Sequence, residues 1–172
     1  VFKRILLKLS GEALRSPGSM DNISPEIVAR IAEEIAQAHR AGVQIGLVVG
    51  GGNFWRGRSS GKMERTLADK IGMLATVMNA LAVSDKLEQL GVPTEVFTSI
   101  TMPQVAPAFT RKEALHAMEE GKIAIFGGGT GNPFFSTDTT TALRAVEVSA
   151  DIMFKATMVD GVYDKDPHKY PD

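Results

Sequence analysis

Two glycine-rich segments are the first sign of chemistry in this sequence, at residues 50–53 (Gly-Gly-Gly-Asn) and 127–132 (Gly-Gly-Gly-Thr-Gly-Asn). Each follows a short apolar run rich in β-branched residues, at residues 45–49 and 123–126, which is typical of a buried strand. Because glycine has no Cβ, its backbone amide can approach a ligand closely and adopt positive φ. Successive amides in such turns bind anions. Two such turns in one chain predict a ligand with phosphate groups at two places.

Lys8 and Asp138 are the charged side chains expected to act beside these loops. Lys8 ends an apolar segment and Gly11 follows it, so a phosphate could come close. Taken alone, Lys8 is better explained as an edge lysine that reaches water, but the glycine loops favour a function. Asp138 ends a segment of hydroxyls, an amide and two phenyl rings before a predicted helix. It could hold Lys8, lie near a bound Mg²⁺ or cap the helix, as Thr137 also could.

Other candidates have weaker support from their surroundings. Arg56 could bind an anion beside the first glycine loop, or could be a solvated arginine in a tight turn. Asp69 lies near the start of a long predicted helix, where capping is a stronger explanation than binding of sugar hydroxyls. Trp55 is expected to pack rather than to recognise a ligand. Tyr163 could stack on a base and Asp166 could accept from a ribose, although an ordinary turn-rich loop explains both.

Two familiar nucleotide fingerprints are absent from the glycine loops. The dinucleotide pattern G-x-G-x-x-G fails because Trp55 and Asn132 stand where its third glycine belongs. The phosphate-binding pattern G-x-x-x-x-G-K-[ST] fails because Arg58 replaces its lysine. A phosphate-binding function would therefore need a different glycine-loop architecture.

Composition narrows the class of protein. The sequence has 172 residues, 44% of them hydrophobic, which is enough for one domain with a proper core. A formal net charge of -1 argues against nucleic-acid or membrane-surface partners, which usually meet a basic face. There are no cysteines, which fits a cytoplasmic protein, and the three histidines lack metal-ligand spacing. No leader segment or membrane-spanning run is expected.

Predicted strands and helices alternate along the chain. Ser24 and Thr110 are expected to cap two of the helices. Continuous apolar strands alternating with helices predict a three-layer, doubly wound, mainly parallel α/β sheet with helices on both faces, in one domain spanning residues 1–172. Ligands of such folds bind at the carboxyl ends of strands, where both glycine loops fall. The expected strands are residues 2–9, 43–49, 94–99, 122–126 and 151–156, and the expected helices are residues 25–42, 66–90, 110–121 and 138–148.

Five segments in order along the chain resemble the bacterial-type UMP (uridylate) kinases of the amino-acid-kinase family. Thr-Gly-Asn-Pro-Phe-Phe is the most specific of these motifs. The resemblance implies transfer of the ATP γ-phosphoryl group to UMP, giving UDP and ADP, with Mg²⁺ held mainly by nucleotide phosphates. The segments are residues 8–12 (Lys-Leu-Ser-Gly-Glu), 50–53, 72–76 (Gly-Met-Leu-Ala-Thr), 129–135 and 159–163 (Val-Asp-Gly-Val-Tyr).

The resemblance also implies roles for individual residues, and we expect Lys8 and Asp138 to be the catalytic pair. It implies that ATP is bound by Lys8, Leu9, Ser10, Gly11, Gly52, Arg56, Thr157, Tyr163 and Asp166. It implies that UMP is bound by Gly51, Asp69, Thr130, Gly131, Asn132, Pro133, Phe134, Phe135, Ser136 and Thr137.

Members of this family form homohexamers, respond to GTP and are inhibited by UTP, so a cytoplasmic homohexamer in pyrimidine biosynthesis is expected here, with GTP and UTP as candidate effectors. Family chains continue beyond the position of Asp172, so the C-terminal part of the fold is expected to be missing. Residues 15–20 differ from the glycine-richer stretch linked to GTP activation.

Three alternatives stay open. The first is a sister kinase acting on a carboxylate or carbamate. The second is a non-catalytic nucleotide or oxyanion storage protein, and the third is a nucleotide-sensing module.

If the protein is a UMP kinase, the acceptor is already an anion and needs no general base. Lys8 would then stabilise the transferred group, while Asp138 orients the lysine or the metal.

Overall fold

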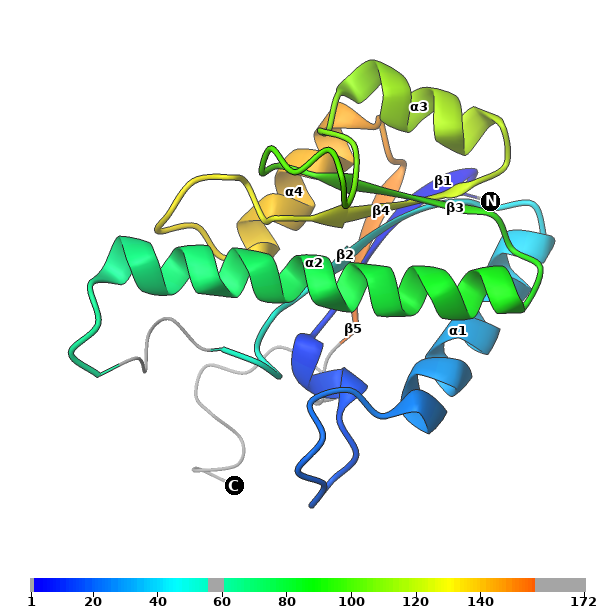
Figure 1. Cartoon of the computed structure of the whole chain (residues 1–172). Helices are drawn as coiled ribbons and strands as arrows, with labels where there is room; N and C mark the ends of the chain where they lie inside the picture. The colour runs from blue at the N-terminus through cyan, green and yellow to red at the C-terminus, as the bar shows by residue number, and fades with distance from the viewer. Residues whose placement is uncertain (1, 56–60, 157–172) are drawn as a thin grey trace, which may run out of the picture.

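The computed structural model describes residues 2–55 and 61–156. Its centre is a five-stranded sheet in the order β3-β4-β2-β1-β5, and every neighbouring pair is parallel (Figure 1). This confirms the predicted parallel sheet. The candidates Arg56, Thr157, Tyr163 and Asp166 lie outside the described residues. The strands are β1 (Arg4–Leu9), β2 (Gln44–Val49), β3 (Thr94–Thr98), β4 (Ile123–Gly127) and β5 (Ile152–Ala156).

Helices cover both faces of the sheet, with α1 and α2 on one side and α3 and α4 on the other (Figure 1). Each face of the sheet has its own hydrophobic core, and alternate strand residues belong to one or the other. Ile45 and Leu47 of β2 pack with α1 and α2, whereas Val48 packs with α3. This alternation explains why the strands read as continuous apolar runs. The helices are α1 (Pro25–Arg40), α2 (Arg65–Gln89), α3 (Arg111–Glu119) and α4 (Thr137–Glu147), and a 3₁₀ turn, η1, covers Gly11–Leu14.

Two helix caps agree with the sequence and two do not. Ser24 accepts from the backbone N–H of Ile27, and Thr110 caps α3, as predicted. The cap of α2 is Glu64, whose carboxylate accepts from the amides of Thr66 and Leu67, so the capping explanation of Asp69 is wrong. The cap of α4 is Ser136, so neither Asp138 nor Thr137 fills that position. The carboxylates of Asp69 and Asp138 are therefore available for other contacts.

The long helix α2 is apolar because much of it is core. By length and composition alone this helix could cross a membrane, contrary to expectation. A core helix of a globular domain can have the same length and apolar composition. Here Ala80, Val83 and Leu87 pack into the cluster between α1, α2 and the sheet, which accounts for the hydropathy.

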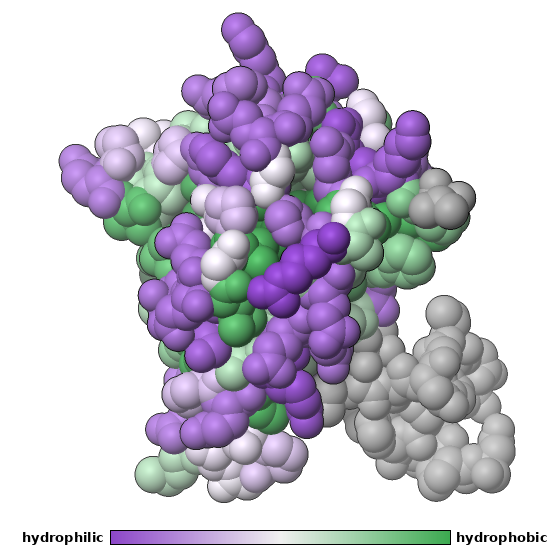
Figure 2. All heavy atoms as spheres, turned by 90° about the vertical axis from the view of Figure 1, so that its right-hand side faces the viewer, coloured by the Kyte–Doolittle hydropathy of each residue, from purple (hydrophilic) through white to green (hydrophobic). Residues whose placement is uncertain are grey.

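The edge of the sheet at which the strands begin is largely hydrophilic. Figure 2 shows this side, where hydrophobic residues appear in small patches among polar ones. Lys122, just before β4, pairs there with Glu95 at 3.0 Å and with Glu120 at 3.3 Å. The glycine loops and the candidate charged groups lie at the opposite edge, where the strands end.

Candidate functional site

Three charged side chains meet at the carboxyl edge of the sheet. The Nζ atom of Lys8 lies 3.1 Å from one carboxylate oxygen of Asp138, and the Nζ atom of Lys155 lies 2.8 Å from the other. Lys8 and Lys155 are register partners on the adjacent strands β1 and β5. Lys155 is not among the site residues predicted from the sequence, because nothing in the sequence reveals that β5 pairs with β1.

This cluster carries more positive than negative charge. Two ammonium groups face one carboxylate, and Lys8 is only 8% exposed. Burial by itself would raise the pKa of Asp138, but the hydrogen bonds and positive charges of Lys155 and Lys8 together place its pKa below the ordinary value. Asp138 is therefore ionised at neutral pH, and the excess positive charge favours an anionic ligand.

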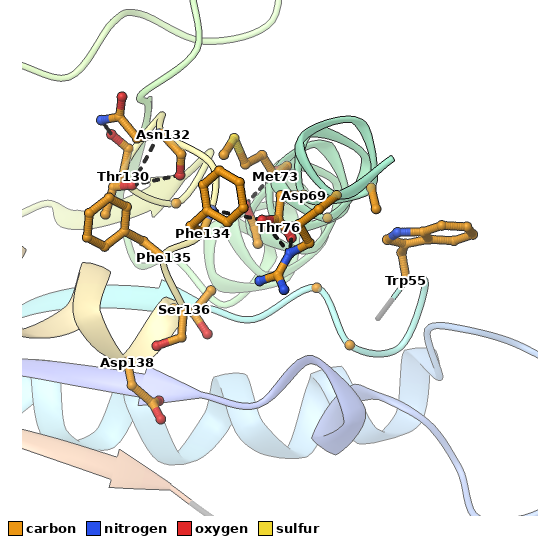
Figure 3. Close-up of a pocket in the computed structure, with 17 residues that line it drawn as sticks. Trp55, Asp69, Met73, Thr76, Thr130, Asn132, Phe134, Phe135, Ser136 and Asp138 are labelled. Atoms are coloured by element: carbon orange, nitrogen blue, oxygen red, sulfur yellow. Dashed lines mark hydrogen bonds and ion pairs between the residues drawn. The ribbon is translucent and has the colours of Figure 1, made fainter. Parts of the chain in front are cut away.

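Asp138 also borders a pocket of about 610 Å³ (Figure 3). The pocket lies between the first glycine loop, α2 and the segment that leads into α4. It is large enough for a small organic ligand, and Asp138 belongs both to its wall and to the charged cluster. Its walls are Gly51, Gly52, Trp55, Arg65, Ala68, Asp69, Gly72, Met73, Thr76, Gly129, Thr130, Asn132, Phe134, Phe135, Ser136, Thr137 and Asp138.

Asp69 connects two walls of this pocket. Its carboxylate accepts from the Nε of Arg65 at 2.8 and 2.9 Å, and from the backbone N–H of Phe134 at 2.8 Å. Phe134 has a φ of +72°, a conformation rare for a bulky residue. The Arg65 guanidinium lies 5.6 Å from the Phe134 ring centroid. Asp69 thus holds a strained aromatic residue at the pocket wall, a pattern that often accompanies ligand binding.

The two glycine loops use their glycines differently. In the second loop, Gly128, Gly129 and Gly131 have φ values of +80°, +60° and +79°, as predicted for a turn of amides. In the first loop the glycines are needed for space rather than for positive φ. A Cβ on Gly51 would lie 2.7 Å from the carbonyl oxygen of Gly72 in α2. The first loop can therefore approach α2 this closely only with a glycine at position 51.

Most of the residues that the resemblance implies for UMP binding border the pocket, but Gly131 and Pro133 do not. Gly11 lies against the first loop, because a Cβ there would be 2.4 Å from the Gly50 oxygen. Leu9 ends β1 and Ser10 precedes η1, outside the pocket wall. Trp55 also borders the pocket.

Asp69 is the one predicted site residue on α2, and the other residues of α2 that border the pocket were missed from the sequence. Arg65, Gly72, Met73 and Thr76 border the pocket together with Asp69. They recur at spacings of three or four residues, which places them on one side of the helix. Continuing this spacing from Asp69 along the predicted helix would have found Gly72, Met73 and Thr76, whereas Arg65 precedes the predicted helix start.

The chain matches the sequence model of the Amino acid kinase family over residues 3–172. The chain belongs to this family.

Solved structures agree with this assignment. The crystal structure of UMP kinase from Ureaplasma parvum shares 35% sequence identity with a TM-score of 0.90, covering 99% of this chain and 73% of that one. The crystal structure of UMP kinase from Bacillus anthracis shares 37% identity with a TM-score of 0.90, covering 97% of this chain and 70% of that one. This member of the amino acid kinase family is thus similar to UMP kinases over nearly its whole length, and is a kinase of this fold.

Proposed function

We propose that this amino acid kinase family member transfers the γ-phosphoryl group of ATP to UMP, giving UDP and ADP. The observation that carries the proposal is the joining of a cationic cluster to a pocket through one residue. Lys8 and Lys155 both contact Asp138, and Asp138 borders the pocket. An acceptor in the pocket would present its phosphate to the two lysines. The similarity to UMP kinases supports a nucleotide as that acceptor.

The difficulty in this reaction is the repulsion between two polyanions. An oxygen of the UMP phosphate attacks the γ-phosphorus, and the bond from that phosphorus to the β–γ bridging oxygen breaks, so ADP leaves with the electron pair. The ammonium groups of Lys8 and Lys155 would stabilise charge on the transferred group and the leaving oxygen. Asp138 would hold both ammonium groups in place. No base is required, because the attacking oxygen is already an anion.

ATP binds as its Mg²⁺ complex, in which the phosphates of ATP supply most of the contacts to the metal. Its phosphates would lie by Lys8, Ser10, Gly11 and Gly52, on the β1 side of Asp138. Within residues 2–55 and 61–156, no three His, Cys, Asp or Glu side chains gather as a metal site. The predicted contacts of Arg56 with phosphate, and of Thr157, Tyr163 and Asp166 with the ATP nucleoside, stay predictions. So do homohexamer assembly, the responses to GTP and UTP, and a cytoplasmic location.

A substrate panel tests the proposal. ADP formation is measured with MgATP and UMP, CMP, N-acylated amino acids or carbamate as acceptors. UMP should give the highest kcat/KM. Higher turnover of a carboxylate or carbamate would replace the proposal by the sister-kinase alternative. Nucleotide binding without turnover of any acceptor would favour storage or sensing.

Lys8→Ala tests the chemistry within the same assay. Loss of one electrostatic donor should lower kcat by roughly 10²–10³-fold. Lys3→Ala, an exposed lysine just before β1 at the other edge of the sheet, is the matched control and should keep kcat. Turnover by Lys8→Ala close to that of Lys3→Ala would refute the assigned role.

A further inference from the structure

The second glycine loop is supported from outside the pocket by Ser99, the residue after β3. The Ser99 hydroxyl donates to the carbonyl oxygen of Gly129 at 2.8 Å. A Cβ on Gly131 would lie 2.9 Å from the Ser99 carbonyl oxygen, so loop and Ser99 are packed against each other. Gly129 and the following Thr130 border the pocket. The position of this wall therefore depends on Ser99.

Ser99 is in turn held by Arg144 of α4. The Nη2 of Arg144 donates to the Ser99 hydroxyl oxygen at 2.7 Å. Arg144 is 4% exposed, its guanidinium carbon lies 3.7 Å from the centroid of the Phe109 ring, and its Nη1 pairs with Glu147. A buried, stacked guanidinium has little rotational freedom, so it is a fixed point for its hydrogen-bond partner.

These bonds give the Ser99 hydroxyl one orientation. A hydroxyl has a single proton to donate and can accept through its lone pairs. Because the Ser99 oxygen accepts from a cation, its proton is directed to Gly129, and the two bonds strengthen each other. Arg144 follows Asp138 by six residues on α4, about 9 Å along the helix axis. One helix thus holds both the carboxylate of the charged cluster and the support of the glycine loop.

We propose that Arg144 is a positioning residue: through Ser99 it fixes the Gly129–Thr130 wall of the pocket relative to Asp138. This inference rests on the proposed function for its kinetic consequence, since that wall would hold the acceptor nucleotide. Arg144 itself does not border the pocket. Its loss should therefore weaken acceptor binding more than it affects ATP.

The experiment compares Ser99→Ala and Arg144→Met with Arg111→Met. Arg111 is the matched control, because it also donates to a serine hydroxyl, that of Ser149 at 3.3 Å, but on an exposed surface. The first readout is amide hydrogen exchange in the protein without ligand. Gly131 N–H bonds to the Gly128 oxygen at 3.0 Å, and Gly128 N–H bonds to Thr76 Oγ1 at 2.8 Å, so both amides report on the loop.

Ser99→Ala and Arg144→Met should speed exchange at Gly128 and Gly131 by about 10-fold, and Arg111→Met should not. Combining the two substitutions should add little to Ser99→Ala alone, because both break one chain of bonds. If the exchange rates at Gly128 and Gly131 are unchanged in Ser99→Ala, the inference is overturned, whatever the substrate of the protein. Ser99→Ala is the milder substitution, so its exchange rates still test the inference if Arg144→Met fails to fold.

The second readout is steady-state kinetics with UMP and MgATP. KM for UMP should rise about 10-fold in Ser99→Ala, with KM for ATP within about twofold of wild type. Equal rises in both values, or a loss of thermal stability alone, would show a merely structural role and overturn the inference. Absence of UMP turnover in the wild type would refute the proposed function, while hydrogen exchange would still decide whether Arg144 positions the loop.

Discussion

Asp138 joins the charged cluster to the pocket while half of its side chain stays exposed. Burial would raise its pKa, but the hydrogen bonds and charges of Lys155 and Lys8 together place that pKa below the ordinary value for aspartate. A carboxyl with a lower pKa in the folded state stabilises that state above its unfolded pKa of about 3.9. This stabilisation is lost as the pH falls through the folded-state pKa.

Asp138→Asn should therefore lower the free energy of unfolding at neutral pH, and the difference from wild type should shrink in acid below about pH 4. Urea unfolding at a series of pH values measures this. Asp151→Asn is the matched comparison, because hydrogen bonds from the backbone N–H groups of Arg4 and Lys3 also lower the pKa of Asp151, away from the pocket. Asp151→Asn should show the same acid dependence and keep turnover. A difference for Asp138→Asn that stays constant with pH would contradict this reading.

At the scale of elements, the first glycine loop and α2 are in direct backbone contact. Gly51→Ala would place a Cβ 2.7 Å from the Gly72 oxygen and 2.9 Å from the Ala75 Cβ. Overpacking of this kind costs about 1–3 kcal/mol, because a helix backbone cannot move aside easily. The free energy of unfolding, measured with urea, should fall by that amount.

Gly72→Ala is the matched control on the helix side of the same contact. A Cβ at Gly72 meets no atom within 4 Å, and alanine is the better helix former. The control should therefore stabilise the protein by about 0.5–1 kcal/mol. If both substitutions changed the free energy of unfolding in the same direction, the close approach of the loop to α2 would not explain why position 51 is glycine.

At the scale of the whole molecule, two buried asparagines fasten distant segments together. The Nδ2 of Asn79 in α2 donates to the Gly50 oxygen and to Asn53 Oδ1, both at 2.7 Å. Asn53 donates to the Asn22 carbonyl oxygen at 2.8 Å. The stretch before α1, the first glycine loop and the long helix thus share one polar network inside the fold.

Asn79→Ala should lower the free energy of unfolding by about 1–3 kcal/mol, because it leaves buried polar partners unsatisfied. Asn132→Ala is the control: Asn132 is exposed and bonds locally to Thr130, so its loss should change stability by at most about 0.5 kcal/mol. Chemical denaturation of both variants measures the two costs. Similar costs would mean that the network contributes little.

The sequence by itself determined the elements and their carboxyl-edge loops. Apolar periodicity, Ser24 and Thr110 as caps, and the two glycine segments predict the strands, most helix ends and the edge at which ligands bind. These signals are local, because helix and strand periods and turn residues are set by neighbours along the chain. The pairing of Lys8 with Asp138 followed from placing both at that edge.

Tertiary structure alone decided which distant groups meet. The chain returns to place β5 beside β1, and this topology brings Lys155 to Asp138. Likewise, Asp69 reaches the Phe134 amide across 65 residues, and Ser99 meets both Gly129 and Arg144. The physical reason is that strand order and register come from packing between segments far apart in sequence, where many pairings satisfy the same local pattern.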